Sequence, residues 1–323
     1  MALDRKGPGL LLRDIAGGKD AQIAAIGRVA AALNADVLIL TAFDYDRGGV
    51  ALDAFAAALA QAGAAYPHRF ALAPNSGVPT RLDLDGDGLR GGPRDAQGYG
   101  LFPGNAGMAI LSRLPVDRAG ARDLSRLLWR DLPDGIPPPL AQDAGVQRLS
   151  TTGHWIVPLL LPDGRSLRLL TWYATPPVFD GEEDRNGRRN HDEAALWLRL
   201  LEGQLPVPPP APPFVIAGDA NLDPEDGEGR PEALRALLAH PGLQNPAPRG
   251  THRRVEPGTS GDPALDTALY DEIGGLRVDY ILPSADLTVA AAGVLWPPEG
   301  DPLAADLAAA SRHRPVWVDL VLP

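Results

Sequence analysis

Apolar residues recur along this chain with helical and extended spacings. Between Asp20 and Leu33 they fall three and four positions apart, which predicts a helix with Asp20 as its N-cap. Residues 37–40 form an unbroken apolar run that is typical of a buried strand. Residues 51–62 are again amphipathic, and residues 68–73 have the composition of a strand. The first quarter of the chain is therefore predicted to alternate helices with strands.

The rest of the chain mixes the same two patterns. Residues 154–159 and 167–172 predict a β-hairpin around a Pro-Asp-Gly turn. Residues 121–139 predict an amphipathic helix that a run of prolines ends. Further elements are expected as helices at 192–204 and 232–239 and as strands at 214–216, 276–284 and 316–318.

Two long segments lack any period. Residues 74–105 are too rich in Gly, Pro and Asp for regular structure, and a loop of this length is usually functional. It contains Asp83, Asp85 and Asp87 in the pattern Asp-x-Asp-x-Asp-Gly, the first half of a calcium loop. Because Arg94 stands where an EF-hand needs glutamate, the alternatives are a structural Ca²⁺ site and an acidic surface turn. Residues 251–271 are predicted to form a flexible, polar loop.

Composition narrows the class of protein. The 323 residues are 45% hydrophobic with a mean hydropathy of -0.10, and no apolar run is long enough to span a bilayer, so a soluble globular protein is expected. The net charge of -11 argues against a surface for tight, non-specific binding of nucleic acid. The absence of cysteine excludes disulfides and thiolate metal sites.

The best candidate for chemistry follows the apolar run at 214–216. Asp219 and Asn221 are two positions apart, so on an extended segment they face the same way. A carboxylate and a carboxamide placed so can act together on a metal-bound water or a phosphoryl oxygen. The alternative is an ordinary turn, since turns select the same residue types.

The last fifth of the chain supplies an acid and a histidine. Asp279 lies within the predicted strand at 276–284, and His313 precedes the last strand. A carboxylate on one strand end and an imidazole on another form a plausible base and orienting group, because the acid holds the tautomer of the imidazole and favours its cation.

The order of three motifs resembles the endonuclease/exonuclease/phosphatase superfamily, which includes pancreatic deoxyribonuclease, abasic-site endonucleases, sphingomyelinases and inositol polyphosphate phosphatases. The motifs are Gly-Asp-x-Asn at 218–221, Arg-Val-Asp-Tyr-Ile-Leu-Pro-Ser at 277–284, and Ser-x-His-Arg-Pro-Val at 311–316. Residues 107–115 also match a strand of that family. The resemblance implies an α/β (α+β) fold, a four-layer sandwich of two mainly antiparallel sheets flanked by helices, with residues 1–323 forming one domain.

The resemblance also implies an activity. Members of the superfamily hydrolyse phosphoesters with a divalent ion, Mg²⁺ or Mn²⁺. The resemblance therefore implies that Asp219 and Asn221 bind the metal and position water, and that Asp279 orients His313. The expected activity is that of a phosphodiesterase or phosphatase. Because the chain is acidic, a small phosphoester is a more plausible substrate than polymeric DNA. The protein is expected to be a monomer.

Four positions depart from the family pattern. Ala42 replaces the metal-binding glutamate, and Asp44 or Asp46 is the alternative ligand on the same segment. Tyr173 replaces a histidine, and Arg312 replaces an aspartate. In the family, the first strand carries an asparagine of the active site. That strand would lie upstream of Met1, so we expect it to be missing. As written, the chain is expected to be cytoplasmic, and it is expected to be exported if a signal was lost together with that strand.

Other residues are candidates for binding substrate. Arg188 and Asn190 can donate hydrogen bonds to phosphate, as can Arg312, although the first two equally suit a solvated helix start. Two functions therefore remain open. The protein is either a phosphoester hydrolase with a rearranged site, weakened by its substitutions, or a catalytically decayed member that binds a partner or serves a structural role.

Overall fold

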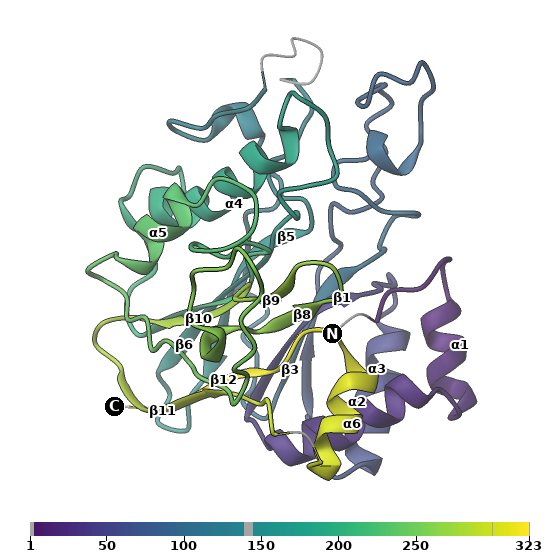
Figure 1. Cartoon of the computed structure of the whole chain (residues 1–323), viewed down its shortest axis with the longest axis vertical. Coiled ribbons are helices and arrows are strands. Elements are labelled where there is room, and N and C mark those ends of the chain that lie inside the picture. Colours follow the sequence, from purple (N-terminus) through teal and green to yellow (C-terminus); the bar gives the residue numbers. More distant parts are fainter. Residues whose placement is uncertain (1–2, 139–144, 299, 323) are drawn as a thin grey trace.

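Two β-sheets stacked face to face form the middle of the molecule, and helices cover the outer face of each (Figure 1). The structure is a computed structural model that describes residues 3–138, 145–298 and 300–322. The layers run helix, sheet, sheet, helix, which is the α/β sandwich expected from the resemblance.

The first sheet is antiparallel and has the order β1-β3-β2. Its strands are β1 (Val37–Phe43), β3 (Gly107–Ser112) and β2 (His68–Phe70). The outer face of this sheet packs against α1 (Leu10–Gly17), α2 (Ala21–Leu33), α3 (Val50–Gln61) and α6 (Pro302–Ala310). The predicted N-cap of α2 is confirmed, because the Ile23 N–H donates to the Asp20 carboxylate at 2.9 Å.

The second sheet has the order β10-β7-β6-β5-β4 and is antiparallel except for the parallel pair β6 and β7. Its strands are β10 (Asp279–Pro283), β7 (Phe214–Asp219), β6 (Ser166–Tyr173), β5 (Gly153–Leu160) and β4 (Arg122–Asp123). The predicted hairpin is β5 and β6, and β10 is the core of the strand expected at 276–284.

Side chains alternate between the layers with the two-residue period of a strand. On β3, Met108 and Ile110 enter the core between the sheets, whereas Ala109 and Leu111 face the helices. On β7, Val215 points inward in the same way. The strands read as continuous apolar runs because both of their faces are buried.

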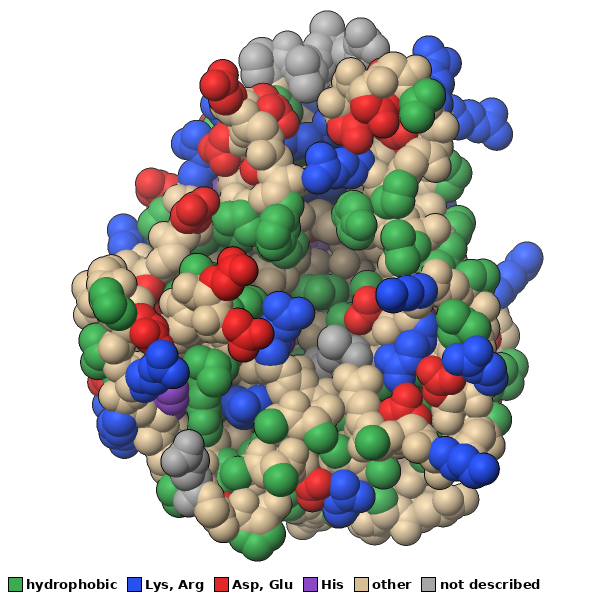
Figure 2. Space-filling model, turned by 45° about the vertical axis from the view of Figure 1, so that its right-hand side comes forward, with side chains coloured by type: hydrophobic (Ala, Val, Ile, Leu, Met, Phe, Trp, Pro, Cys, Tyr) green, Lys and Arg blue, Asp and Glu red, His purple; other side chains and the backbone are tan. Residues whose placement is uncertain are grey.

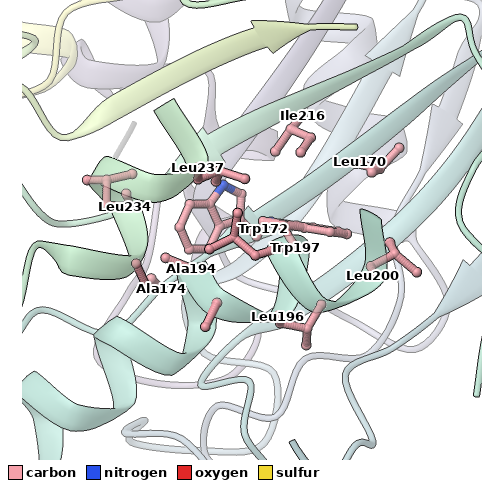
Figure 3. Close-up of a cluster of buried hydrophobic side chains, with 14 of the residues drawn as sticks. Leu170, Trp172, Ala174, Ala194, Leu196, Trp197, Leu200, Ile216, Leu234 and Leu237 are labelled. Atoms are coloured by element: carbon pink, nitrogen blue, oxygen red, sulfur yellow. The ribbon is translucent and has the colours of Figure 1, made fainter. Parts of the chain in front are cut away.

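A second outer core lies under α4 (Arg185–Leu201) and α5 (Glu232–Leu238). Figure 3 shows Trp172 of β6 and Trp197 of α4 at its centre, with Leu234 and Leu237 of α5 beside them. Neither α4 nor any other helix in the described part of the chain has both the length and the apolar character to cross a membrane.

The helix predicted within residues 121–139 is wrong over its described part. Instead, Leu124 and Trp129 reach the outer core from an irregular segment with one 3₁₀ turn, Trp129–Asp131. The backbone N–H groups there bond to carbonyls elsewhere in the chain: that of Leu124 donates to the His154 carbonyl and that of Trp129 to the Gln147 carbonyl. Long-range pairing therefore overrides a helical spacing of apolar residues.

The remaining elements are short strands, helical turns and loops. The strands form the pairs β11 (Thr288–Val294) with β12 (Val316–Val321), and β8 (Ala268–Tyr270) with β9 (Gly274–Leu276). The other 3₁₀ turns are Pro93–Asp95 and Pro263–Leu265. Figure 2 shows one face of the molecule hollowed across its middle, with acidic and basic side chains interspersed on it.

Candidate active site

Three polar side chains stand in a row across one end of the five-stranded sheet. Tyr173 ends β6, Asp219 ends β7 and Asp279 begins β10. The registers place Tyr173 opposite Asp219, and Asp219 opposite Asp279. Neighbouring strands lie about 4.8 Å apart, so sheet pairing alone brings these distant parts of the sequence together.

His313 joins this row from the loop between α6 and β12. Its Nδ1 atom lies 2.9 Å from Oδ2 of Asp279 and 3.9 Å from Oδ2 of Asp219. The backbone of His313 forms an antiparallel bridge with Ala268 of β8, which fixes the loop beside the sheet. The structure thus places the predicted acid and histidine in hydrogen-bond contact.

Burial and mutual charge set the electrostatics of the cluster. Burial, reinforced by the charge of Asp279, raises the pKa of Asp219 to about 7. Burial by itself lowers the pKa of His313, but the charges of Asp279 and Asp219 outweigh it, so its pKa is raised. The imidazole is therefore biased toward its cation, and the carboxylates are its counter-charges.

Thr267 is a site residue that the sequence analysis missed. Its hydroxyl donates to Oδ2 of Asp279 at 2.9 Å and accepts the backbone N–H groups of Val278 and Asp279. The loop expected at 251–271 is accordingly not structureless at this end: it contains β8, whose Leu269 N–H donates to the carbonyl of Arg312 at 3.1 Å.

Tyr270, at the end of β8, was also missed. Its ring and that of His313 form a T-shaped pair, with 6.3 Å between ring centroids and 72° between planes. The guanidinium of Arg312 lies over the same ring, 5.5 Å from its centroid. Arg312 itself is exposed, so solvent reaches this cation beside His313.

Gly218 serves strand packing. A Cβ at this position would lie 2.0 Å from the carbonyl oxygen of Trp172 on β6. The glycine of the Gly-Asp-x-Asn motif is therefore needed for the close approach of β6 and β7, and a close approach of backbone to ligand is not required to explain it.

Asn221 departs from the predicted geometry. β7 ends at Asp219, and Asn221 has a left-handed backbone with φ 49°, so the two residues do not share one extended segment. The Asn221 N–H donates to the Asp219 carboxylate at 2.8 Å, and its Nδ2 donates to the Ala174 carbonyl at 2.9 Å. Its Oδ1 atom has no hydrogen bond to another described residue.

The acids after β1 are engaged by other parts of the chain. Asp44 is buried and accepts hydrogen bonds from the N–H groups of Arg5 and Ala106 and from the amide of Asn105. Asp46 caps α3 by accepting two backbone N–H groups. Both carboxylates thus accept hydrogen bonds from backbone N–H groups. Neither belongs to the cluster of Asp219, Asp279 and His313, whose ligand atoms lie within 4.8 Å of one another.

Ala42, at the position where the family resemblance implies a metal-binding glutamate, has an unusual backbone. Its φ is 54°, and the pairing of β1 with β3 shifts register between Leu40 and Phe43. A left-handed, non-glycine residue at a bulge costs on the order of 1 kcal/mol and is typical of functional sites.

The two donors on α4 are engaged within the protein. The helix begins at Arg185, so both lie in its first turns. Asn190 is buried, and its Nδ2 donates to the carbonyls of Thr175 and Ala220 at 2.6 and 2.7 Å. Arg188 is half-buried and its Nε donates to the Glu183 carbonyl at 3.2 Å. The first turns are therefore not a fully solvated helix start.

Three carboxylates lie close together in the acidic loop within residues 74–105. Ligand atoms of Asp83, Asp85 and Asp87 lie within 4.8 Å of one another, as do those of the Asp219 cluster. Asp83 accepts the N–H groups of Gly86 and Gly88, which suffices to explain the turn. The calcium site stays a prediction.

Comparison with known proteins agrees with the resemblance. The model of the Endonuclease/Exonuclease/phosphatase family matches residues 14–313. None of the curated proteins matches the chain.

Several solved structures share the fold. An endonuclease/exonuclease/phosphatase from Beutenbergia cavernae has a TM-score of 0.55 at 17% identity, over 94% of this chain and 66% of its own. A family protein from Leptotrichia buccalis has a TM-score of 0.51 at 14% identity, over 93% of each chain. The mannosyl-6-phosphatase Bt3783 of Bacteroides thetaiotaomicron has a TM-score of 0.50 at 15% identity, over 99% of this chain and 97% of its own.

Proposed function

The chain belongs to the endonuclease/exonuclease/phosphatase family, and from that premise we propose that it hydrolyses a small phosphoester with the help of a divalent metal ion. One observation carries the proposal: Asp219, Asp279 and His313 meet at one end of the second sheet, with the imidazole 2.9 Å from a carboxylate. The phosphatase among the structural neighbours supports the same class of reaction for this fold.

The residues present fit a hard cation. Carboxylate and amide oxygens are the ligands that Mg²⁺ and Mn²⁺ prefer. The Asp219 carboxylate and the unpaired Oδ1 of Asn221 would hold the ion, because Oδ2 of Asp279 is already engaged by Thr267 and His313. When bound, the ion supplies Lewis-acid polarisation of a phosphoryl oxygen and lowers the pKa of a bound water.

Side chains of the protein supply proton donation and hydrogen bonds to the phosphoryl group. Asp279 accepts the Nδ1–H of His313, which leaves the Nε2 atom of the imidazole to donate a hydrogen bond or a proton to a phosphoryl or leaving-group oxygen. Thr267 keeps Asp279 oriented for this task. Tyr173 can donate its phenolic O–H to another phosphoryl oxygen.

A second candidate function is binding without turnover. The observations that favour it are alanine at position 42 and the engagement of the Asp44 carboxylate by two backbone N–H groups and the side-chain amide of Asn105. A site with one charged ligand fewer binds the ion more weakly and stabilises less charge in the transition state.

A hydrolysis assay separates the two candidates. Protein stripped with EDTA and reloaded with MgCl₂ or MnCl₂ is given p-nitrophenyl phosphate and bis-p-nitrophenyl phosphate. We expect metal-dependent turnover that Asp219→Ala and His313→Ala each lower by about 100-fold or more. Asp36→Ala, at a side chain that is 77% exposed, is the matched control and should not change the rate. No turnover by the unmodified protein favours the binding role, and turnover that survives both substitutions indicates contamination.

A further inference from the structure

Two phenol groups flank the carboxylate pair from different elements. Tyr173 stands opposite Asp219 in the sheet, and Tyr270 reaches the cluster from β8 through its contact with His313. An ordinary phenol has a pKa near 10, so both hydroxyls are protonated at neutral pH and can donate hydrogen bonds.

Neither of these hydroxyls has a hydrogen-bond partner among the described residues. By contrast, the hydroxyl of Tyr66 donates to the Ala35 carbonyl at 3.0 Å, and that of Tyr280 bonds to two backbone carbonyls. A largely buried phenol usually finds a partner. The hydroxyls of Tyr173 and Tyr270 are thus free to bind a ligand.

Arg312 adds a cation with no ion pair to a described residue. Its guanidinium rests on the ring of Tyr270, and Tyr270 in turn packs against Ala268, Leu276 and Val278. Stacking on a ring that is itself held in place limits where the guanidinium can go. Arg312 and Tyr270 therefore present their donors as a unit.

We propose that Tyr173, Tyr270 and Arg312 form the recognition set for a terminal phosphate, so that the substrate is a phosphomonoester; this rests on the proposed hydrolase function. Two phenols, a guanidinium and the Nε2 atom of His313 supply donors for all three unesterified oxygens of a terminal phosphate. A phosphodiester has only two such oxygens and a single negative charge. It would leave part of this donor set, and the charge of Arg312, unmatched.

The test compares ester classes and phosphate binding. Steady-state rates are measured on Mn²⁺-loaded protein with p-nitrophenyl phosphate and with bis-p-nitrophenyl phosphate, and inorganic phosphate is titrated in by calorimetry. We expect the monoester to have the higher kcat/KM. In Tyr270→Phe, the KM for the monoester and the Kd for phosphate should both rise about tenfold, as for a lost bond to a charged group. Arg312→Gln should raise both at least as much.

The control is Tyr99→Phe, a tyrosine that is 61% exposed, and it should change neither value. A higher kcat/KM for the diester would overturn the inference and leave the hydrolase function standing. Phosphate binding that is absent, or unchanged in Tyr270→Phe and Arg312→Gln, would overturn it as well. If neither ester is hydrolysed, the hydrolase function falls, and phosphate binding that these two substitutions weaken would still support the recognition set.

Discussion

The Nδ1 atom of His313 lies 2.9 Å from Oδ2 of Asp279, and these residues are 34 positions apart in the chain. The same oxygen accepts the hydroxyl of Thr267 at 2.9 Å. Because Oδ2 of Asp279 is held from two sides, this carboxylate orients the imidazole, and we propose Asp219 as the carboxylate that binds the metal ion.

Removing the charge of Asp279 should lower the pKa of His313. In Asp279→Asn, the burial that disfavours the imidazolium remains, while the largest contribution that favours it is lost. NMR titration of the His313 ring measures the shift directly. If the imidazolium is the proton donor, the alkaline limb of the pH–rate profile moves to lower pH. Thr267→Val keeps the charge and is the control; an equal fall in pKa there would contradict the assignment.

Restoring a carboxylate at position 42 should strengthen metal binding. The family resemblance implies a metal-binding glutamate there, and Ala42 has a left-handed backbone where the pairing of β1 with β3 shifts register. We expect Ala42→Glu to lower the Kd for Mn²⁺, measured by calorimetry, about tenfold, because affinity grows with the number of charged oxygen ligands. Ala42→Gln matches the size without the charge. Equal affinities of the two variants would refute the expectation.

Asn190 should matter for stability. Its amide joins the loops after β6 and β7 by donating to the carbonyls of Thr175 and Ala220, and it is 1% exposed. Asn190→Ala leaves these buried carbonyls unpaired and should lower the free energy of unfolding by about 2–3 kcal/mol. Urea denaturation measures this. Arg188→Ala, in the same turns, should stay within about 0.5 kcal/mol; a similar loss in both variants would speak against the specific role of Asn190.

His154 should make the protein sensitive to acid. It is fully buried, with Nδ1 2.7 Å from the Ser150 hydroxyl and Nε2 3.0 Å from the Glu193 carbonyl, and burial lowers its pKa to about 3. The unfolded chain takes up the proton near pH 6.5 and the folded chain only near pH 3. Stability from this group is therefore full above pH 6.5 and falls by about 1.4 kcal/mol per pH unit below it.

The free energy of unfolding of the unmodified protein and of His154→Gln, each measured from pH 7 to pH 5, tests this. The contributions of all other groups are common to both proteins and cancel in the difference. The variant should lose less stability over that range. Parallel curves would mean that the pKa of His154 is the same in the folded and unfolded chain, which would contradict the expectation.

The spacing of apolar residues correctly predicted the helices and strands that bury large apolar faces. The helix from Asp20 to Leu33 and the hairpin of β5 and β6 are present, because their leucine, isoleucine and tryptophan side chains fill the cores. Alanine-rich α6 and β11 carry too weak a pattern to be predicted. At residues 121–138 the pattern misled, because the backbone N–H groups of Leu124 and Trp129 bond to the carbonyls of His154 on β5 and of Gln147 instead of forming helical hydrogen bonds.

The candidate site was half predictable. Asp219, Asp279 and His313 stand in motifs at strand ends, and the sheet register brings them together. Thr267 and Tyr270 carry no local signal, since their roles arise only when β8 pairs with the loop of His313. The turn at Asn221 likewise depends on the carbonyl of Ala174 from another loop.

The most direct test of the account is where a metal ion and phosphate bind. Crystals grown with MnCl₂ and phosphate would show an Mn²⁺ ion by anomalous scattering. We predict a peak about 2 Å from the Asp219 carboxylate, with phosphate within hydrogen-bond distance of His313 and Tyr270. A peak confined to the loop of Asp83, Asp85 and Asp87, or phosphate bound elsewhere with the Asp219 cluster empty, would contradict the assignment of this cluster as a hydrolytic site.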